Sequence, residues 1–352
     1  MILAGLIVSS FNGKITTLSD TILSSSKEAV ELCILMFGIV GLWSGLMNIA
    51  LSLGITTQLQ KLLTPFLTFL FPKLKNQKAK EYISTNIVAN ILGLGWAATP
   101  SGLKAMEELQ KDNPDKNTAT NEMCSFLILN ISSLQLIPIN IIAYRSQYGS
   151  VNPSKILIPG LIATLGSTIV RELYQMEGPK TMITFLANLV IPLFIFTLVL
   201  YGTLKRKDIY TPFLEGVMDG FKIVLEIAPT LIALFFAIQI FRSSGALDLI
   251  VRFLTPMGKL LKIPKEVLPV IFAKLFSSSA ATGFLLDIYK TSGPDSLAGF
   301  MSSVILSSTE TCFYTLSVYY SVVGIEKIRY TLTGALLAVF VGTFISVFIS
   351  YF

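Results

Sequence analysis

The stretch Met182–Tyr201 reads MITFLANLVIPLFIFTLVLY and contains no charged side chain. About 20 mostly apolar residues are enough for a helix to cross the hydrocarbon core of a bilayer. Such a run is expected to be helical because lipid cannot hydrogen-bond to exposed backbone groups. The basic triplet Lys205 to Lys207 follows shortly after it, as is common at the cytoplasmic end of a span. This stretch therefore predicts a transmembrane helix.

The composition of the whole chain agrees with that prediction. Of its 352 residues, 53% are hydrophobic and 14% are charged, and the mean hydropathy is +0.70. A soluble domain has about 25% charged residues, so this chain has too few charges to cover a water-exposed surface. Composition excludes an ordinary soluble enzyme, a disordered chain and a nucleic-acid binder. It predicts a multi-spanning membrane protein, with the lipid bilayer as its surroundings.

The counts of histidine and cysteine limit the chemistry. The chain has no histidine, which excludes histidine-based zinc sites and Ser–His or Cys–His nucleophilic pairs. The three cysteines, Cys33, Cys124 and Cys312, lie far apart in apolar runs and are expected to be small buried hydrophobic residues. Neither a metal site nor a cofactor is predicted.

Seven further apolar stretches are candidate spans, and together they predict an all-α polytopic membrane protein. They are Ala29–Leu53, Met123–Tyr144, Ile156–Val170, Ile223–Phe241, Leu268–Tyr289, Leu297–Val323 and Thr331–Phe352.

One more apolar region, Tyr82–Leu109, is interrupted by Gly93, Gly95, Pro100 and Gly102. Helices broken inside a membrane persist only where protein or a cavity satisfies the freed backbone groups. In transporters such breaks often expose helix ends to a substrate. The region predicts a broken or re-entrant helix, and the structural alternative is a kink that allows close helix packing.

The two parts of the chain resemble each other. Ser52–Pro65, SLGITTQLQKLLTP, matches Ser243–Pro256, SSGALDLIVRFLTP, at a separation of 191 residues. Further on, the sequence SSLQ at 132–135 faces SSTE at 307–310, at a separation of 175 residues. This pattern predicts two repeats, residues 1–175 and residues 176–352. Placing the basic loops on the cytoplasmic side gives the first helix of each repeat opposite directions, which predicts inverted repeats with a site between them. Repetition can also be purely architectural.

Glu310 lies within a predicted span, in the sequence VILSSTETCFYTLSVYY. An ionised carboxylate is costly at the bilayer centre, so such residues usually face a cavity or a partner. The neighbouring Ser308 and Thr309 supply hydroxyls for a polar ligand. Gln135 is the equivalent position in the first repeat, with Ser133 beside it. The alternatives are a structural glutamate, protonated or paired, and an amide that joins helices.

Lys274 lies in a second broken segment, AKLFSSSAATGF, and aligns with Asn90 in the first. A lysine at that depth needs an anion, either Glu310 or a carboxylate or phosphate of the substrate, unless it extends to the interface. Ser278 would line the turn between the half-helices. A Ser278–Lys274 catalytic dyad would be in reach if both lay on one helix face. Enzyme motifs such as HExxH, GxSxG and Walker A are missing, so we predict that the chain is not an enzyme.

Four stretches carry a resemblance to a known family. NIVANILGLGWAATPSGLKAMEELQ and TATNEMCSFLILNISSLQLIPINIIAYR resemble spore maturation protein A. FRSSGALDLIVRFLTP and GPDSLAGFMSSVILSSTETCFYTLSVYYSVVGIEKIRYTL resemble spore maturation protein B. The chain thus resembles a fusion of the two, which belong to the nucleoside-recognition (Gate) domain group.

The resemblance implies a core similar to that of concentrative nucleoside transporters. In those proteins a Gln-Thr-Glu stretch contacts the ligand, and Ser308–Glu310 is the nearest counterpart here. The resemblance therefore implies a transporter of a small polar or anionic solute, with nucleoside-like solutes among the candidates. H⁺ or Na⁺ is the implied coupling ion, because no nucleotide-binding motif supplies ATP energy. Homo-oligomerisation and a non-transporting membrane scaffold for envelope or spore maturation stay open.

Overall fold

The computed structural model describes residues 3, 16–72, 74–91, 95–132, 135, 138–168, 193–245, 251–252, 255–256, 258 and 261–351. In these ranges the regular elements are helices, and the β-structure consists of an isolated parallel bridge between Thr118 and Lys327. The predicted all-α class is confirmed for the part of the chain that the structure describes.

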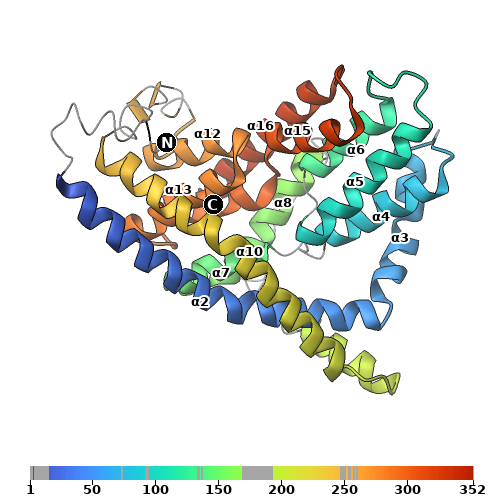
Figure 1. The fold of residues 1–352 in the computed structure, drawn as a ribbon, viewed down its shortest axis with the longest axis horizontal. Helices are drawn as coiled ribbons and strands as arrows, with labels where there is room; N and C mark the ends of the chain where they lie inside the picture. Colours follow the sequence, from blue (N-terminus) through green and yellow to red (C-terminus); the bar gives the residue numbers. More distant parts are fainter. Residues whose placement is uncertain are drawn as a thin grey trace. The chain divides into compact units, whose positions relative to one another are not determined.

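The helices follow one another along the chain as Figure 1 shows. They are α2 (Thr16–Ser52), α3 (Ile55–Leu70), α4 (Gln77–Ile91), α5 (Gly95–Lys111), α6 (Asn121–Ser132), α7 (Ile139–Gln147), η1 (Pro153–Ile156), α8 (Leu157–Thr168), a helix at Leu193–Leu204, α10 (Tyr210–Ser243), η3 (Lys265–Val267), α12 (Leu268–Phe276), α13 (Ser278–Ser292), α14 (Leu297–Ser308), α15 (Cys312–Val323) and α16 (Thr331–Ile349).

The chain forms two compact units. Unit 1 comprises residues 1–48, 139–153 and 210–303, and unit 2 comprises residues 49–138, 154–209 and 304–352. Each unit takes segments from both of the halves that the sequence predicts as repeats.

In unit 1, α2 and α10 cross at two glycine pairs. A Cβ atom added to Gly220 would lie 2.7 Å from the Cα of Gly41, and one added to Gly216 would lie 2.8 Å from the Cα of Gly45. Small residues four apart let membrane helices approach to backbone contact. The later residue on α2 meets the earlier residue on α10, so the two helices run antiparallel.

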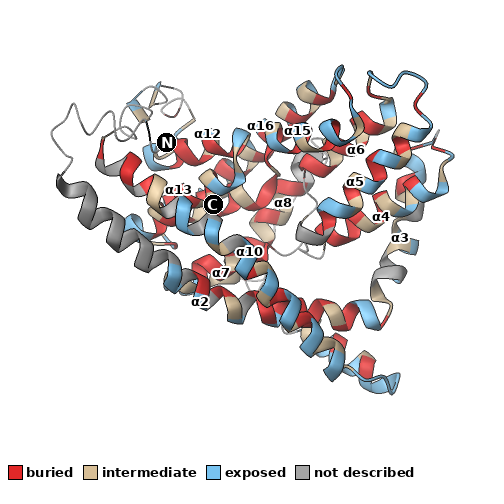
Figure 2. Ribbon diagram, in the orientation of Figure 1, coloured by how far each residue is buried: buried red, intermediate tan, exposed pale blue. Residues whose placement is uncertain are grey.

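In unit 2, α16 packs against α6 and α8, and α15 packs against α5 and α6. These helices contain many buried residues, which are red in Figure 2. The buried cysteines Cys33, Cys124 and Cys312 are free thiols, which confirms their predicted role as small hydrophobic residues.

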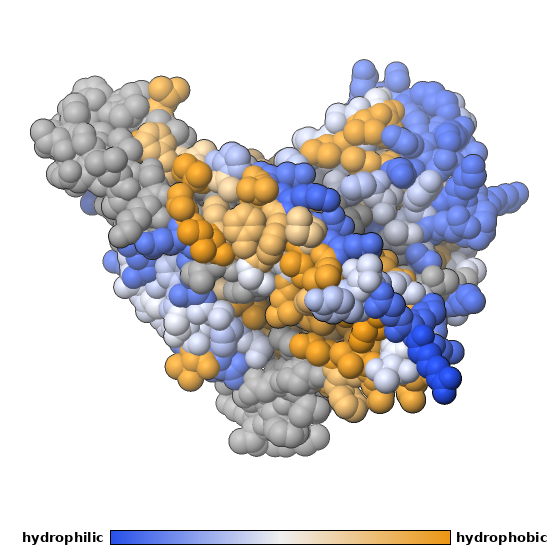
Figure 3. Space-filling view, turned by 60° about the horizontal axis from the view of Figure 1, so that its bottom comes forward, coloured by the Kyte–Doolittle hydropathy of each residue, from blue (hydrophilic) through white to orange (hydrophobic). Residues whose placement is uncertain are grey.

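Among the described residues, α16 is the helix with the length and apolar composition needed to cross a bilayer. The segments Met36–Ser52 and Leu193–Leu204 are apolar but shorter. Residues 182–192 of the predicted span Met182–Tyr201 lie outside the described residues. Helix α16 exposes a stripe of large apolar side chains at helical spacing, namely Leu337, Phe340, Phe344 and Phe348. Apolar residues also reach the molecular surface in the space-filling view (Figure 3).

The predicted interruption of Tyr82–Leu109 is confirmed in part, since α4 ends at Ile91 and α5 begins at Gly95. Gly93 lies outside the described residues, and Pro100 and Gly102 lie inside α5 and do not interrupt it. The predicted break within Leu268–Tyr289 is also confirmed, and it lies at Ser277, whose backbone is extended (φ −148°, ψ 114°). Two other predictions were wrong. Met123–Tyr144 and Leu297–Val323 are not single helical spans. The first contains α6 and α7, with Gln135 and Pro138 described as non-helical between them, and the second contains α14 and α15, joined by the non-helical residues 309–311.

Candidate functional site

Glu310 lies in the non-helical connection between α14 and α15, not inside a span as the sequence suggested. Its side chain is half-buried, and its backbone N–H donates to the carbonyl oxygen of Ile131 at 2.8 Å. Ile131 is in the last turn of α6, so this bond joins Glu310 to a helix that comes almost 180 residues earlier in the sequence. This bond fixes the backbone position of Glu310, the only carboxylate among the predicted site residues.

Serine hydroxyls explain why α14 ends where it does. Ser307 Oγ donates to the carbonyl oxygen of Val304 at 3.0 Å, and Ser308 Oγ donates to that of Ile305 at 2.9 Å. Serine and threonine side chains that bond to nearby carbonyls compete with the helical backbone ladder. The sequence SSTET at 307–311 contains four serine and threonine residues and therefore favours a helix end.

The first half has a matching break between α6 and α7. Ser132 Oγ donates to the carbonyl oxygen of Leu129 at 2.8 Å at the end of α6. Gln135 is half-buried and non-helical, and Pro138 immediately precedes α7, where proline disfavours helical backbone in the residue before it. Gln135 thus lies in a break, as Glu310 does. The predicted site residue Ser133 lies outside the described residues.

A chain of amides connects Asn90 to this region. Asn90 Nδ2 lies 3.1 Å from Asn130 Oδ1 and 3.4 Å from Asn86 Oδ1. Asn130 Nδ2 donates to the Tyr319 hydroxyl at 3.0 Å, and Asn86 Nδ2 donates to the carbonyl of Ala98 at 2.7 Å. The network ties together α4, α5, α6 and α15. Because Asn130 directly precedes Ile131, the structure brings Asn90 and Glu310 to the same end of α6.

Gly102 explains part of the interrupted sequence in α5. A Cβ atom there would clash with the Tyr319 hydroxyl and would lie 2.8 Å from Asn86 Nδ2. Glycine is needed so that α5 can approach the network. The sequence pattern identified Asn90 but missed Asn86 and Tyr319, because buried amides and tyrosines in apolar runs look like ordinary packing residues.

Thr309 carries a hydroxyl without a hydrogen-bond partner among the described residues. Its Oγ1 atom is buried, and the whole residue is 3% exposed. Buried polar atoms are nearly always paired, so such an atom needs an explanation such as a water or a ligand. It lies directly beside Glu310, in the segment that the sequence predicted to bind a solute.

Lys274 and Ser278 belong to unit 1, whereas Glu310, Gln135 and Asn90 belong to unit 2. Lys274 is 3% exposed in the last turn of α12, and Ser278 is exposed at the start of α13. The extended residue Ser277 separates them and caps α13 by accepting from the N–H of Ala280 at 3.1 Å. Lys274 and Ser278 therefore do not lie on one face of a single helix, and the hypothesis of a Ser278–Lys274 dyad at helical spacing is wrong.

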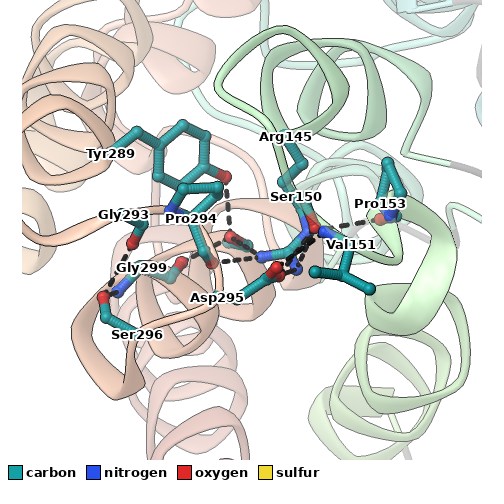
Figure 4. A network of polar contacts seen from close by, with 11 residues as sticks. Arg145, Ser150, Val151, Pro153, Tyr289, Gly293, Pro294, Asp295, Ser296 and Gly299 are labelled. Atoms are coloured by element: carbon teal, nitrogen blue, oxygen red, sulfur yellow. Dashed lines mark hydrogen bonds and ion pairs between the residues drawn. The ribbon is translucent and has the colours of Figure 1, made fainter.

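Unit 1 contains a polar cluster that the sequence did not reveal, centred on Arg145 at the end of α7 (Figure 4). The Arg145 side chain is fully buried. It donates to the carbonyls of Pro153 (3.2 Å) and Pro294 (2.7 Å), to the hydroxyls of Ser150 (3.0 Å) and Ser303 (3.2 Å), and to the carboxylate of Asp295 (2.5 Å). Five donors meet five acceptors, so the guanidinium fork is saturated. This arrangement describes a structural clamp rather than a binding site.

Asp295 completes the cluster in the turn between α13 and α14. Its carboxylate accepts from Ser150 Oγ at 2.6 Å and from the N–H of Val151 at 2.8 Å. Burial raises its pKa, but these hydrogen bonds and the charge of Arg145 outweigh burial and hold the pKa of Asp295 below its ordinary value. The ionised form is therefore the one that the folded protein stabilises.

We expect the contribution of Asp295 to stability to disappear in acid. Because its folded pKa is lower than its unfolded pKa, the stabilisation is present above the unfolded value and is lost as the pH falls through the folded value. The melting temperature of the wild type should exceed that of Asp295→Asn at about pH 7, and the gap should narrow below about pH 4. Thermal melts of both proteins across this pH range give the measurement. A gap that stays constant would show that the charge of Asp295 is not what stabilises the turn.

The described residues contain no group of three or more histidine, cysteine, aspartate or glutamate side chains placed to hold a metal ion. What unit 2 offers instead is one carboxylate, several hydroxyls and several amides at the broken ends of α6 and α14. Such groups recognise a small solute by hydrogen bonds.

The chain is similar to one family model and to two known proteins. The Gate family model, described as nucleoside recognition, matches residues 224–326. Spore maturation protein B of Bacillus subtilis (strain 168) is 40% identical over 167 residues, which are 47% of this chain and 94% of that protein. Spore maturation protein A of the same organism is 37% identical over 166 residues, which are 47% of this chain and 85% of that protein. No solved structure matches the chain significantly.

Proposed function

Because the chain belongs to the family of spore maturation proteins A and B and carries a Gate domain, we propose that it is a non-enzymatic multi-pass protein of the bacterial cytoplasmic membrane that transports a small polar solute. The low charge content of 14% supports the membrane location. The exposed apolar stripe of α16 supports it too, since lipid would cover these side chains.

Two inverted repeats, residues 1–175 and residues 176–352, are part of this proposal. The equivalent helices α2 and α10 end 191 residues apart, at Ser52 and Ser243, and cross in antiparallel directions. Glycine pairs at equivalent positions also share the left-handed backbone conformation. Their φ angles are 73° for Gly54 and 85° for Gly245, and 76° for Gly149 and 68° for Gly324. Inverted repeats are a common design of secondary transporters.

The buried, unpartnered hydroxyl of Thr309 carries the proposal for the site. In this proposal a polar or anionic, nucleoside-like solute accepts or donates a hydrogen bond there. Glu310 and Ser308 flank Thr309, and Gln135, Ser133 and Asn90, from the same unit of the chain, complete the proposed site. H⁺ or Na⁺ would supply the energy of transport.

Glu310→Gln is expected to weaken solute binding at least tenfold. The glutamine amide has one acceptor oxygen where the carboxylate has two, and it has no negative charge to balance a positive one. The first step is a thermal-shift screen of nucleosides, nucleobases, small dicarboxylates and amino acids on purified wild-type protein. The variant and Thr309→Val are then titrated with the solute that raises the melting temperature. Glu226→Gln, at an exposed position on α10, is the matched control and should bind like the wild type.

Two results would count against the proposal. If Glu310→Gln and Thr309→Val bind the identified solute as well as the wild type does, the site lies elsewhere. If the wild type neither binds nor transports any solute of the panel after reconstitution into vesicles, the scaffold alternative is favoured.

A further inference from the structure

The contacts that close each unit join the first half of the chain, residues 1–168, to the second half, residues 193–352. In unit 1, α2 meets α10 at the glycine crossing, and Phe37 packs edge-to-face on Phe221 with ring centroids 5.3 Å apart. Asn48 Nδ2 donates to the carbonyl of Pro212 at 2.7 Å. The first half therefore supplies one side of this interface along the length of a helix.

A second contact in unit 1 docks the end of α7 onto the turn between α13 and α14. Arg145 and Val151 bind both the backbone and the carboxylate of this turn, at Pro294 and Asp295. Nearby, the rings of Tyr148 and Tyr289 pack in a tilted arrangement with centroids 5.7 Å apart. The turn with Pro294 and Asp295 belongs to the second half, and Arg145 and Val151, which bind it, belong to the first.

Unit 2 contains a similar contact between a loop and a segment that follows a short helix. Here the loop, which follows α5, belongs to the first half, and the segment that binds it, which follows α15, belongs to the second. The carbonyl of Asn117 accepts from the N–H groups of Glu326 (3.0 Å) and Lys327 (2.9 Å), and the N–H of Ala119 donates to the carbonyl of Lys327 at 3.0 Å. In each unit, then, the loop of one half is bound by the end of a short helix from the other.

The helices of unit 2 are packed in the same way. Both α15 and α16, from the second half, lie against α6, from the first. Met123, Cys124, Phe126 and Leu127 on α6 are completely buried. Without the second half these apolar side chains and the Arg145 guanidinium would lose their surroundings.

Each half also has the length of a complete separate polypeptide. The two curated relatives each match 47% of this chain, yet the matched parts are 94% and 85% of those proteins. Half of this chain therefore corresponds to one whole relative.

We infer that the chain is a covalently joined pair of interlocking subunits, in which each half is the binding partner of the other and the join between them is not needed for assembly. The surface by which the first half binds the second consists of the face of α2 with Gly41 and Gly45, the end of α7 with Arg145, and α6. Its ligand is a chain with the fold of the second half. This inference does not depend on which solute, if any, the protein transports.

The test cuts the join in the assembled protein. A protease site with flexible flanks is inserted between Gly178 and Pro179 of the full chain, and different affinity tags are placed at the two ends. After purification in mild detergent and cleavage, we expect both fragments to be retained by either tag in equal amounts and to elute at the volume of the intact chain. Separation of the fragments under these conditions would overturn the inference.

A matched pair of variants shows whether retention comes from the described interface. Gly220→Leu, whose Cβ would meet the backbone of α2, should reduce the retained fraction several-fold, whereas Gly38→Leu, whose Cβ meets nothing within 4 Å, should not. Equal retention in both variants would refute the glycine interface. If the insert resists protease, a stop codon and a new start codon at the same position produce the halves as separate chains. Co-purification of the two tags is again expected, and recovery of one tag alone overturns the inference.

Discussion

Arg145→Met is expected to lower the free energy of unfolding by about 3 kcal/mol, because an acceptor that loses its donor in a buried place costs about 1–3 kcal/mol, whereas the Asp295 carboxylate, which is 40% exposed, is solvated by water. The methionine keeps the apolar stem of the side chain but removes the guanidinium and all five hydrogen-bond donors. The carbonyl oxygen of Pro294 then loses a bond in a buried place, and that of Pro153 loses one in a half-buried place. Thermal melts in detergent should show a decrease of several degrees, at roughly 2 °C for each kcal/mol in a chain of this size.

Two further variants distinguish lost hydrogen bonds from lost packing. Arg145→Lys retains the positive charge but has three donors in place of five, so its stability should lie between those of the wild type and Arg145→Met. Arg252→Met removes an exposed arginine and should melt like the wild type. If Arg145→Met melted at the wild-type temperature, the cluster would not stabilise unit 1.

Gly216→Leu is expected to prevent the native crossing of α2 and α10. The new Cβ would lie 2.7 Å from the Cβ of Asn48 and 2.8 Å from the Cα of Gly45, and it would clash with the carbonyl oxygen of Ser44. Backbone atoms cannot move aside as a side-chain tip can, so the helices would have to separate. We expect a loss of about 3 kcal/mol or more, or no monodisperse protein by size-exclusion chromatography.

Gly38→Leu serves as the control because it makes the same substitution on α2 in open space. It should be tolerated, since leucine has a higher helix propensity than glycine. If both variants behave alike, the glycine crossing is not a close contact in the folded protein.

Composition and apolar length were sufficient to predict the helical class and the position of α16. Glycine marked the place where α5 begins, at Gly95, because it acts directly on the backbone, whereas Pro100 lies inside α5 and does not interrupt it. The breaks beside Glu310 and Gln135 were missed, since hydropathy does not register that serine hydroxyls such as those of Ser307 and Ser308 bind the carbonyls of their own helix.

Arg145 was the largest omission. An arginine that follows an apolar run is usually a charge at the membrane interface, and its partner turn lies about 150 residues later in the sequence. Neither half of the pair carries a local signal, because the turn GPDS is typical of any tight loop. Contacts of this kind depend on tertiary structure and cannot be read from periodicity.

The separation of 150 residues between Arg145 and Asp295 also has a consequence for biosynthesis. Ribosomes add about 5–20 residues per second, so Arg145 is made on the order of ten seconds before Asp295. During that interval α6 and α7 have no second half to pack against. Insertion into the membrane and final folding are therefore separate events, and the nascent first half is the species that chaperones and membrane proteases would meet.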